Sequence, residues 1–448
     1  VESYSGVTTP LTFSFAIYAY HRVYVQFCQV LMVPDEEIQE NDYAFANMLG
    51  FLNGRIYYNL KNWYRLISVL PGYSYNSRFM EGMMGVKVSY DKTVKQKNVG
   101  FFSKYFIELP RLALVGANLA YRFWRTDTEV KRFMDVYQAM YNKYKDFDFN
   151  AAPAHKLIDI FNELDNTVLA HWKAPIINDF MAMIFYGVLD ALMKKWDLNA
   201  DPALKNDLLA GQGNVESTLP LRNIQKIARF VAADSELKEL FKTRPAAELK
   251  DMFIPVPGTD RPAGHQQLGS QIAEYLEKFG YRAMCELKLE EPSMNERPEF
   301  LFDMIKNYAA APMPVEEDIG DKERQVREVA ERKVREVLGE QKIFGLIKKI
   351  DLLMFVANWA KKAMAVREYQ RFARTRMYGL MSRIYKAFGL RFVERGVLDK
   401  VDDIFYLTMQ ETLEYVSGTA RSQKLRELSA LRRAEFDEYR AMDELPDR

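Results

Sequence analysis

The sequence contains few of the residues from which proteins build disulfides and metal sites. Cys28 and Cys285 are the only cysteines among 448 residues, so a disulfide framework is excluded and a reducing, cytoplasmic setting is expected. The four histidines never occur with the spacing of a zinc-binding motif, and no C-x-x-C pair is present. We therefore expect no metal site built from this chain.

An excess of charge of one sign and long apolar runs are also absent. The 62 Lys and Arg residues balance 61 Asp and Glu residues, and this net charge of +1 argues against a general nucleic-acid binder. The most apolar window, 180–193, is interrupted by Gly187 and Asp190 and is shorter than the ~20 apolar residues of a membrane span. No signal peptide is visible. We expect neither nucleic acid nor a membrane as a partner.

The sequence lacks the fingerprints of nucleotide binding as well. No G-x-x-x-x-G-K-[ST] loop occurs. The short motif Gly211-Gln212-Gly213 has no third glycine after it and no predicted strand before it, so it does not indicate a dinucleotide site. We expect no nucleotide cofactor in this chain.

What the sequence does contain is typical of a helical globular protein. Hydrophobic residues make up 48% and charged residues 27%, and segments of helical period are separated by Pro- and Gly-containing loops. This pattern predicts an all-α fold, a single large domain over 1–448 with a long central helix at 343–388. At most one short β-hairpin is expected, around 282–289. The Pro-containing stretch 309–320 predicts a soft internal boundary.

One face of the predicted central helix carries several arginines. Arg367, Arg371 and Arg374 recur at i, i+4 and i+7, and Glu368 stands beside them. Planar, permanently charged guanidinium groups are suited to binding phosphate or carboxylate. The alternative interpretation is a solvated charged face without chemistry.

A second candidate site lies in the stretch 47–72, which has helical spacing. Arg55 and Asn62 form part of a polar stripe, and Tyr58 and Trp63 flank it. Aromatic walls with a few placed polar groups are typical of ligand pockets. A core helix whose polar groups bond to neighbouring backbone is the alternative.

Two loops supply the remaining candidates. Thr8 and Thr9 precede Pro10, which pushes Thr9 out of the helical region, and a capping loop would explain both threonines equally well. Arg282 follows Gly280 near a predicted helix end, and Glu286 would pair with it if the helix resumed. The alternative there is a structural corner held by that pair.

Four stretches together resemble the central domain of the PEP-utilising phosphotransferases. This family includes PEP synthase, pyruvate phosphate dikinase and, closest in layout, the rifampin phosphotransferase type. The stretches read G-V-T-T-P-L-T, G-R-I-Y-Y-N-L-K-N-W-Y-R, F-G-Y-R-A-M-C-E-L-K-L-E-E-P, and R-E-Y-Q-R followed by D-D-I-F-Y-L-T. The chain departs from the family pattern at Ala283, where relatives carry Cys or Gly. It departs again at Arg371, where rifampin-type relatives have Lys.

The resemblance implies a substrate-binding helical domain between an ATP-grasp domain and a swivelling histidine domain. In such enzymes ATP phosphorylates a histidine of the mobile domain, which passes the phosphoryl group to a small-molecule acceptor. Arg367, Glu368 and Arg371 would lie at the transfer point, with Glu368 taking the acceptor's proton, and Thr8 and Thr9 would lie nearby. ATP and Mg²⁺ would bind elsewhere in a longer enzyme, and this chain alone would be inactive.

Two further expectations concern the acceptor and the extent of the chain. Pyruvate is an unsuitable acceptor, because the pyruvate site of PEP synthase belongs to a TIM barrel and no repeated βα pattern occurs here. The chain opens without Met and closes on Pro446-Asp447-Arg448, as expected for a section of a longer protein.

A competing hypothesis is a non-catalytic helical module that binds a bulky apolar ligand or a partner protein. The aromatic content of 13% and the 21 methionines suit an adaptable apolar groove. The same residues suit an ordinary core, so a response to anions near the arginines is what separates the two hypotheses.

Overall fold

The computed structural model describes residues 4–70, 109–210, 219–254, 263–283, 286–311 and 319–443. The chain divides into two compact units. Unit 1 comprises Val1–Ile177, Cys285–Glu290 and Met377–Arg448, and unit 2 comprises Asn178–Met284 and Glu291–Arg376. The predicted boundary at 309–320 falls inside unit 2, and its residues 312–318 lie outside the described residues.

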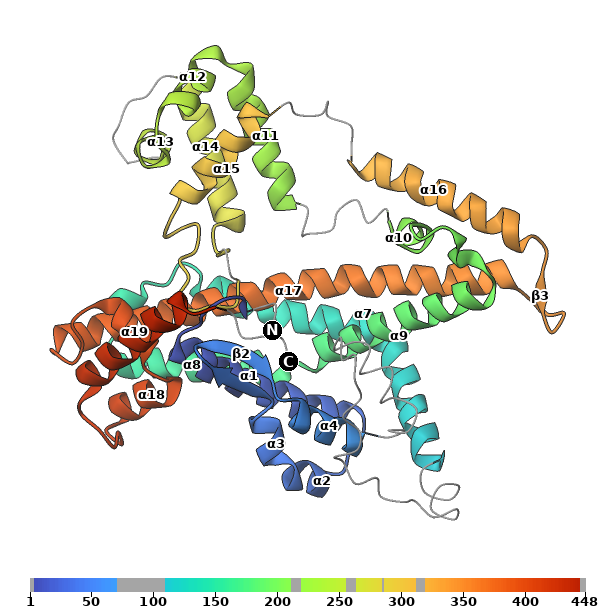
Figure 1. Cartoon of the computed structure of the whole chain (residues 1–448), viewed down its shortest axis with the longest axis horizontal. Coiled ribbons are helices and arrows are strands. Elements are labelled where there is room, and N and C mark those ends of the chain that lie inside the picture. Colours follow the sequence, from blue (N-terminus) through green and yellow to red (C-terminus); the bar gives the residue numbers. More distant parts are fainter. Residues whose placement is uncertain are drawn as a thin grey trace. The chain divides into compact units, whose positions relative to one another are not determined.

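The described residues of unit 1 form helices of very different lengths and one small hairpin (Figure 1). It also takes the first residues of α9 and the last residues of α17. Its own elements are α1 (Pro10–Val30), α2 (Asp35–Glu40), α3 (Asp42–Ala46), β1 (Leu49–Leu52), β2 (Arg55–Tyr58), α4 (Leu60–Val69), α7 (Leu109–Tyr144), η4 (Phe149–Ala151), α8 (Ala154–Thr167), η5 (Leu169–His171), η7 (Val401–Tyr406), α18 (Met409–Ser417) and α19 (Leu425–Ala441).

Helix α1 is the element around which unit 1 packs. Thr9 is extended and Pro10 occupies the first helical turn, where its missing N–H costs nothing. Leu11, Phe15 and Ala16 are buried on one face of the helix. Helix α1 contacts α3, η5, η7 and α18. Segments from both ends of the chain therefore share one core in unit 1.

The stretch 47–72 is not the single helix that its spacing predicted. Residues 49–58 form an antiparallel hairpin, and α4 starts only at Leu60, with Asn59 as its N-cap. The hairpin turn is Asn53-Gly54, and both residues have positive φ (46° and 69°), as a type I′ turn requires. A Cβ at Gly54 would lie 2.6 Å from Val7 Cγ1, so this turn also needs glycine for close packing.

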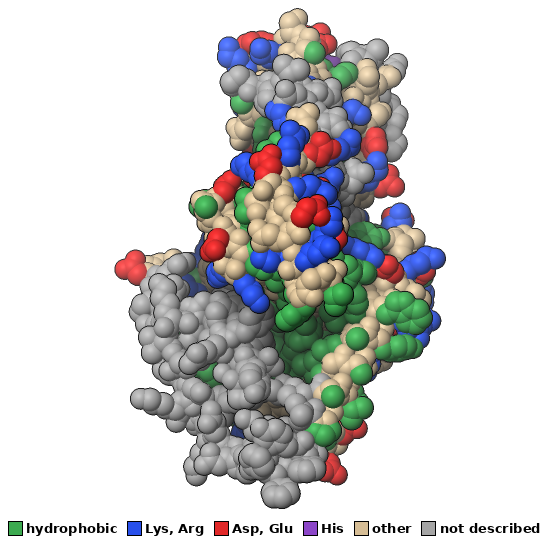
Figure 2. Space-filling view, turned by 90° about the vertical axis from the view of Figure 1, so that its right-hand side faces the viewer, with side chains coloured by type: hydrophobic (Ala, Val, Ile, Leu, Met, Phe, Trp, Pro, Cys, Tyr) green, Lys and Arg blue, Asp and Glu red, His purple; other side chains and the backbone are tan. Residues whose placement is uncertain are grey.

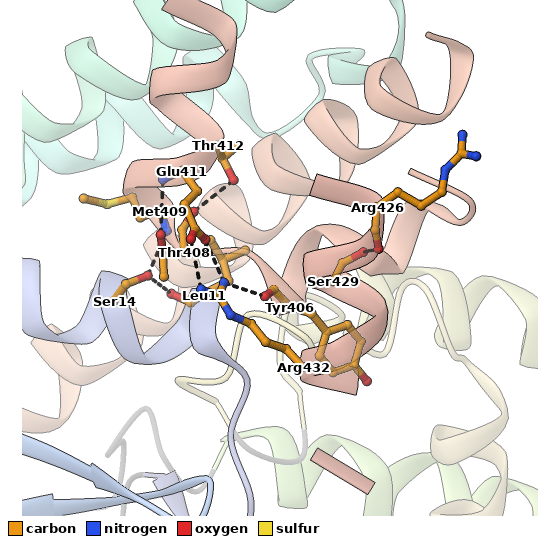
Figure 3. Close-up of polar contacts among 10 residues, drawn as sticks. All are labelled: Leu11, Ser14, Tyr406, Thr408, Met409, Glu411, Thr412, Arg426, Ser429 and Arg432. Carbon is orange, nitrogen blue, oxygen red and sulfur yellow. Dashed lines mark hydrogen bonds and ion pairs between the residues drawn. The ribbon is translucent and has the colours of Figure 1, made fainter. Parts of the chain in front are cut away.

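Capping interactions dock α18 and α19 in unit 1 (Figure 3). Thr408 and Glu411 form a reciprocal capping box at the start of α18. Arg432 of α19 donates to both Glu411 oxygens at 2.7 and 2.9 Å, and to the Tyr406 carbonyl at 3.0 Å. Asp403 is 4% exposed and pairs with Arg433. The D-D-I-F-Y-L-T stretch is therefore a fixing point for the C-terminal helices.

The described residues of unit 2 form two hydrophobic cores. One lies within the bundle α11–α15 seen in Figure 1, and the other joins α9, α10, α16 and α17. The elements are α9 (Lys173–Lys195), η6 (Leu198–Ala200), α10 (Leu204–Leu209), α11 (Leu219–Ala233), α12 (Ser235–Thr243), α13 (Ala246–Phe253), α14 (Ala263–Phe279), α15 (Glu299–Ala310), α16 (Ile319–Leu338), β3 (Lys342–Ile343), β4 (Ile347–Lys348) and α17 (Lys349–Glu394).

The long central helix is confirmed, with shifted ends. Helix α17 has 46 residues and contributes to both units. It begins at Lys349 because residues 342–348 form the hairpin β3–β4, where Phe344 and Gly345 both have positive φ. A short hairpin was predicted around 282–289; the described residues there form a single antiparallel bridge between Ala283 and Ser293, and the short hairpins of the structure lie at 49–58 and 342–348. Within the described residues, β1–β2 and β3–β4 are the only sheets. The fold is all-α, as predicted.

One described stretch, Ala154–Lys195, is long and apolar enough by length and composition to cross a membrane. Its most apolar window is 39% buried, and core helices of soluble proteins pass the same test. The stretch consists of α8, the turn η5 and α9, so it is not one regular helix. The absence of a membrane span remains a prediction. On the face shown in Figure 2, Lys and Arg side chains lie interspersed with Asp and Glu side chains, and hydrophobic side chains are exposed as well.

The Glu411–Arg432 pair makes unit 1 sensitive to acid. Burial acts to raise the pKa of the Glu411 carboxyl, but hydrogen bonds from Arg432 and the Thr408 amide outweigh it, so the pKa lies below its ordinary value. The stabilisation is complete above about pH 4.3 and is lost as the pH falls through the lowered pKa. We expect Glu411→Gln to lower the free energy of unfolding at pH 7 by about 1 kcal/mol.

Urea unfolding at several pH values tests this prediction. Below pH 4 the difference between Glu411→Gln and the native chain should shrink. Glu414→Gln is the matched control, because Glu414 lies on the same helix and bonds to Gln410 rather than to an arginine. An equal loss for both variants would contradict the assignment.

Candidate functional site

The candidate site in unit 2 is built on two turns of α17. Arg367, Arg371 and Arg374 lie on one helix face, and we call these three residues the arginine cluster. Arg371 Nε donates to Glu368 Oε2 at 3.1 Å. Arg371 and Glu368 are about one-third exposed and Arg367 is 62% exposed, so a ligand can reach them.

Helix α9 brings a second carboxylate to the arginine cluster. Asn178 is buried and donates through Nδ2 to the Ala363 carbonyl at 2.9 Å, which fixes this part of α9 on α17. The next residue, Asp179, places Oδ1 at 3.6 Å from Arg367 Nε. Helical periodicity does not indicate Asp179, since its place beside Arg367 depends on the packing of two helices far apart in the chain.

The corner after α14 adds a fourth guanidinium group. Helix α14 ends at Phe279, and hydrogen bonds from the amides of Met294 and Asn295 to the carbonyls of Arg282 and Gly280 close the loop. Arg282 Cζ then lies 5.2 Å from the ring centroid of Phe372, and Arg371 Cζ lies 5.3 Å from the same ring. The structure therefore brings the predicted residues Arg282 and Arg371 together in unit 2.

Several polar atoms at this part of α17 have no hydrogen-bond partner. Gln370 is 3% exposed, and both atoms of its amide are unpartnered, as is the buried Nε of Arg374. Buried polar groups normally have partners, because leaving them unpaired costs free energy. These atoms are buried, so the capacity of the site to bind an oxygen-rich group rests on the exposed guanidinium groups of the arginine cluster.

Unit 1 holds Arg55, for which the sequence predicted substrate binding. Its Nη2 donates to the Met442 carbonyl at 3.0 Å, and its Nη1 donates to the Tyr439 carbonyl at 3.4 Å. Both carbonyls lie at the end of α19, where a positive charge is favourable. Arg55 is 9% exposed. These contacts support the alternative interpretation, in which Arg55 joins the β1–β2 hairpin to α19.

The other predicted residues of this stretch are also mostly engaged in packing. Asn62 is buried and donates through Nδ2 to the Asn47 carbonyl at 2.8 Å. Trp63 is 4% exposed and meets Tyr64 edge to face. Tyr58 is half-buried at the end of β2, not on the helix that was predicted. The hairpin divides the predicted polar stripe, so these side chains do not line one helix face.

Thr8 and Thr9 are buried in unit 1. Glu290 accepts hydrogen bonds from the Thr9 amide at 3.0 Å, the Thr9 hydroxyl at 2.9 Å and the Thr12 hydroxyl at 2.5 Å. Thr9 is thereby occupied at the start of α1, whereas the Thr8 hydroxyl has no partner. Sequence reasoning missed Glu290, although it ends the E-L-K-L-E stretch quoted above.

The helix on which the predicted pair of Arg282 and Glu286 depended does not resume in the described residues. Residues 281–283 and 286–290 form turns and a single bridge, and residues 284–285 lie outside the described residues. The pairing itself stays a prediction.

The described residues contain no group of three or more His, Cys, Asp and Glu side chains that could hold a metal ion. Cys28 is buried, and burial raises the pKa of its thiol to about 12, so it is not a nucleophile near neutral pH. The chemistry available in the arginine cluster is binding of anions and stabilisation of negative charge.

Residues 171–368 match the family model of the rifampicin phosphotransferase fourth domain. The chain contains a phosphotransferase-like domain. The match includes Asp179, Arg282, Arg367 and Glu368 and stops before Arg371. The resemblance to the PEP-utilising phosphotransferases that the motifs indicated is thereby confirmed.

Relatives of the phosphotransferase-like domain agree with this match at low identity. The chain is 25% identical to the rifampicin phosphotransferase of Bacillus cereus over 168 residues, covering 36% of this chain and 18% of that protein. The rifampicin phosphotransferase of Bacillus subtilis is 26% identical over 162 residues, which cover 34% of this chain and 18% of that protein. The rifampicin phosphotransferase of Streptomyces sviceus is 24% identical over 229 residues, which cover 50% of this chain and 25% of that protein. The matches thus span only a part of each relative's length.

The contacts of Arg55 predict a structural role that can be separated from anion binding. We expect Arg55→Ala to lower the free energy of unfolding by roughly 2–3 kcal/mol, because the hydrogen bonds that its charged side chain donates to the carbonyls of Asn53, Tyr439 and Met442 are lost. Phosphate binding should be unchanged. Thermal unfolding with and without phosphate measures both effects, and Lys61→Ala, an exposed change on α4, is the control. Weaker phosphate binding with an unchanged free energy of unfolding would contradict the structural role and indicate that Arg55 binds the ligand.

Proposed function

We propose that this chain binds the acceptor substrate of a phosphohistidine-type phosphotransferase and that transfer takes place beside the arginine cluster. The observation that carries the proposal is the concentration of guanidinium groups around Glu368 and Asp179, within or next to the region that matches the family. A transferring phosphoryl group spreads negative charge over its oxygens, and guanidinium groups stabilise that charge.

Glu368 has two conceivable roles in this reaction. The sequence suggested that it takes the acceptor's hydroxyl proton. Its 3.1 Å hydrogen bond with Arg371 instead favours a positioning role, in which the carboxylate aims the guanidinium group at the phosphoryl oxygens. Arg371 can present two parallel donors, which a lysine at this position would not do.

The proposal includes partners that lie outside this chain. An ATP-grasp domain would phosphorylate a histidine of a swivelling domain of the same polypeptide, using ATP and Mg²⁺, in a cytoplasmic enzyme. The acceptor would be a small hydroxylated molecule. The isolated chain would bind the acceptor without turning it over.

An exposed apolar face on α7 supports the competing hypothesis of a module that binds a bulky apolar ligand or a partner protein. Leu114, Tyr121 and Trp124 on α7 are 61%, 53% and 82% exposed, and their spacing places them on one helix face. A bulky apolar ligand or partner would be stabilised by such a face. That function requires no response to anions at the arginine cluster.

Phosphate binding distinguishes the two hypotheses. We expect phosphate to raise the thermal unfolding temperature of the native chain and Arg371→Ala to abolish most of this increase, because the anion loses a bidentate donor. Arg332→Ala, an exposed arginine on α16, should behave like the native chain. Stabilisation by apolar compounds alone, unchanged by Arg371→Ala, would favour the binding module.

The longer enzyme allows a test of the transfer step itself. We expect Glu368→Ala to leave phosphorylation of the mobile histidine intact and to reduce transfer to a hydroxylated acceptor by at least about 100-fold. Radiolabelled ATP would follow both steps. Loss of histidine phosphorylation as well would contradict a role confined to the acceptor site.

A further inference from the structure

The two carboxylates beside the arginine cluster are engaged differently. Glu368 accepts a hydrogen bond from Arg371 at 3.1 Å. Asp179 lies 3.6 Å from Arg367 Nε, which is an ion-pair distance but longer than a hydrogen bond. Its side chain is 55% exposed, so a bound substrate can reach it. Glu368 thus uses an oxygen lone pair to accept the hydrogen bond from Arg371, whereas Asp179 has lone pairs available to accept a proton.

The surroundings of Asp179 also favour proton uptake. Partial desolvation by the surrounding protein raises its pKa, the charge of Glu368 raises it further, and Arg367 and Arg374 oppose the increase. Because the side chain is 55% exposed, solvent screening limits the shift. Asp179 thus keeps its proton to a higher pH than an ordinary aspartate does, as a general base operating near neutral pH should.

We propose that Asp179 is the carboxylate that takes up the acceptor's proton. In the empty site it pairs with Arg367, the guanidinium group that would otherwise bind the phosphoryl group. While Asp179 is ionised, it competes with an incoming phosphoryl oxygen for Arg367. Once it is protonated, the Arg367 guanidinium group is released to the phosphoryl group. Proton transfer and charge stabilisation are then coupled through one side chain.

The step balances without any further reactant than the phosphohistidine donor of the proposed function. The acceptor's O–H bond breaks, and its proton moves to a carboxylate oxygen of Asp179. The oxygen's electron pair forms the new O–P bond. The P–N bond to the donor imidazole breaks and leaves its electron pair on nitrogen. Glu368 keeps Arg371 oriented through their 3.1 Å hydrogen bond.

This inference rests on the proposed function, and sulfate binding to the native chain tests the two separately. Sulfate keeps both charges between about pH 5 and pH 8, so any change of affinity in this range belongs to the protein. For the native chain we expect the dissociation constant to rise about tenfold over this range, since the ionised Asp179 competes with the anion.

Asp179→Asn should bind sulfate about tenfold more tightly than the native chain at pH 8 and should show no such pH dependence. Asp351→Asn, an exposed and isosteric change at the other end of α17, is the matched control and should behave like the native chain. A native pH dependence retained in Asp179→Asn would overturn the inference.

The outcome of Arg371→Ala separates this failure from failure of the proposed function. If Arg371→Ala weakens sulfate binding while Asp179→Asn changes nothing, the arginine cluster is an anion site and only the role of Asp179 is wrong. If Arg371→Ala has no effect either, the proposed function fails too.

A second measurement needs no change in affinity. Binding and protonation are linked reciprocally, so saturating sulfate must raise the pKa of Asp179 if its proton assists anion binding. The carbon-13 resonance of its carboxyl group, assigned by its disappearance in Asp179→Asn, reports this pKa with and without sulfate. An unchanged midpoint would overturn the inference even if Asp179→Asn folded poorly.

Discussion

Repulsion among like charges on α17 is the constraint on which the candidate site depends. Arg367, Arg371 and Arg374 face the same way within two helical turns, an arrangement that destabilises a helix unless counter-charges lie close by. Glu368 and Asp179 supply those charges at 3.1 and 3.6 Å. With Arg282, four guanidinium groups lie near these two carboxylates among the described residues, and an incoming dianion would neutralise the positive excess. The packing of α9 on α17 is what keeps this balance in place.

The family-like stretches of the sequence divide into structural and chemical ones. In unit 1, Arg55 holds the end of α19, Glu290 holds the start of α1, and Thr408 caps α18. Their polar atoms are used for folding. In unit 2, Arg371 and Asp179 remain partly exposed beside unpartnered polar atoms of Gln370 and Arg374. A sequence motif alone does not distinguish these two uses, because burial and partners decide between them.

The sequence was sufficient to predict what depends on local periodicity. The all-α class, the long helix α17 and the shared face of Arg367 and Arg371 follow from helical spacing. The β1–β2 hairpin is predictable as well, because Asn53-Gly54 is a strong signal for a two-residue turn. The helical spacing of the polar residues around this turn predicts a helix instead and is misleading here.

Contacts between distant segments were out of reach of the sequence. Asp179 meets Arg367 across 188 positions, and Glu290 meets Thr9 across 281. No pattern in one sequence encodes such pairs. Residues 285–290 belong to unit 1 although the residues on either side belong to unit 2, and the amino-acid composition does not mark this change. For the same reason the resemblance pointed to residues of α17 and did not include Asp179 of α9.

The order of the segments along the chain has a consequence for synthesis. Unit 2 is complete once Arg376 has been added, whereas unit 1 still lacks residues 377–448. Helix α1 can pack against α3 and η5 soon after it is translated, whereas its other partners η7 and α18 follow unit 2 in the chain. On the ribosome, part of the apolar face of α1 is therefore covered only after unit 2 has been translated. The core of unit 1 is thus completed later than that of unit 2.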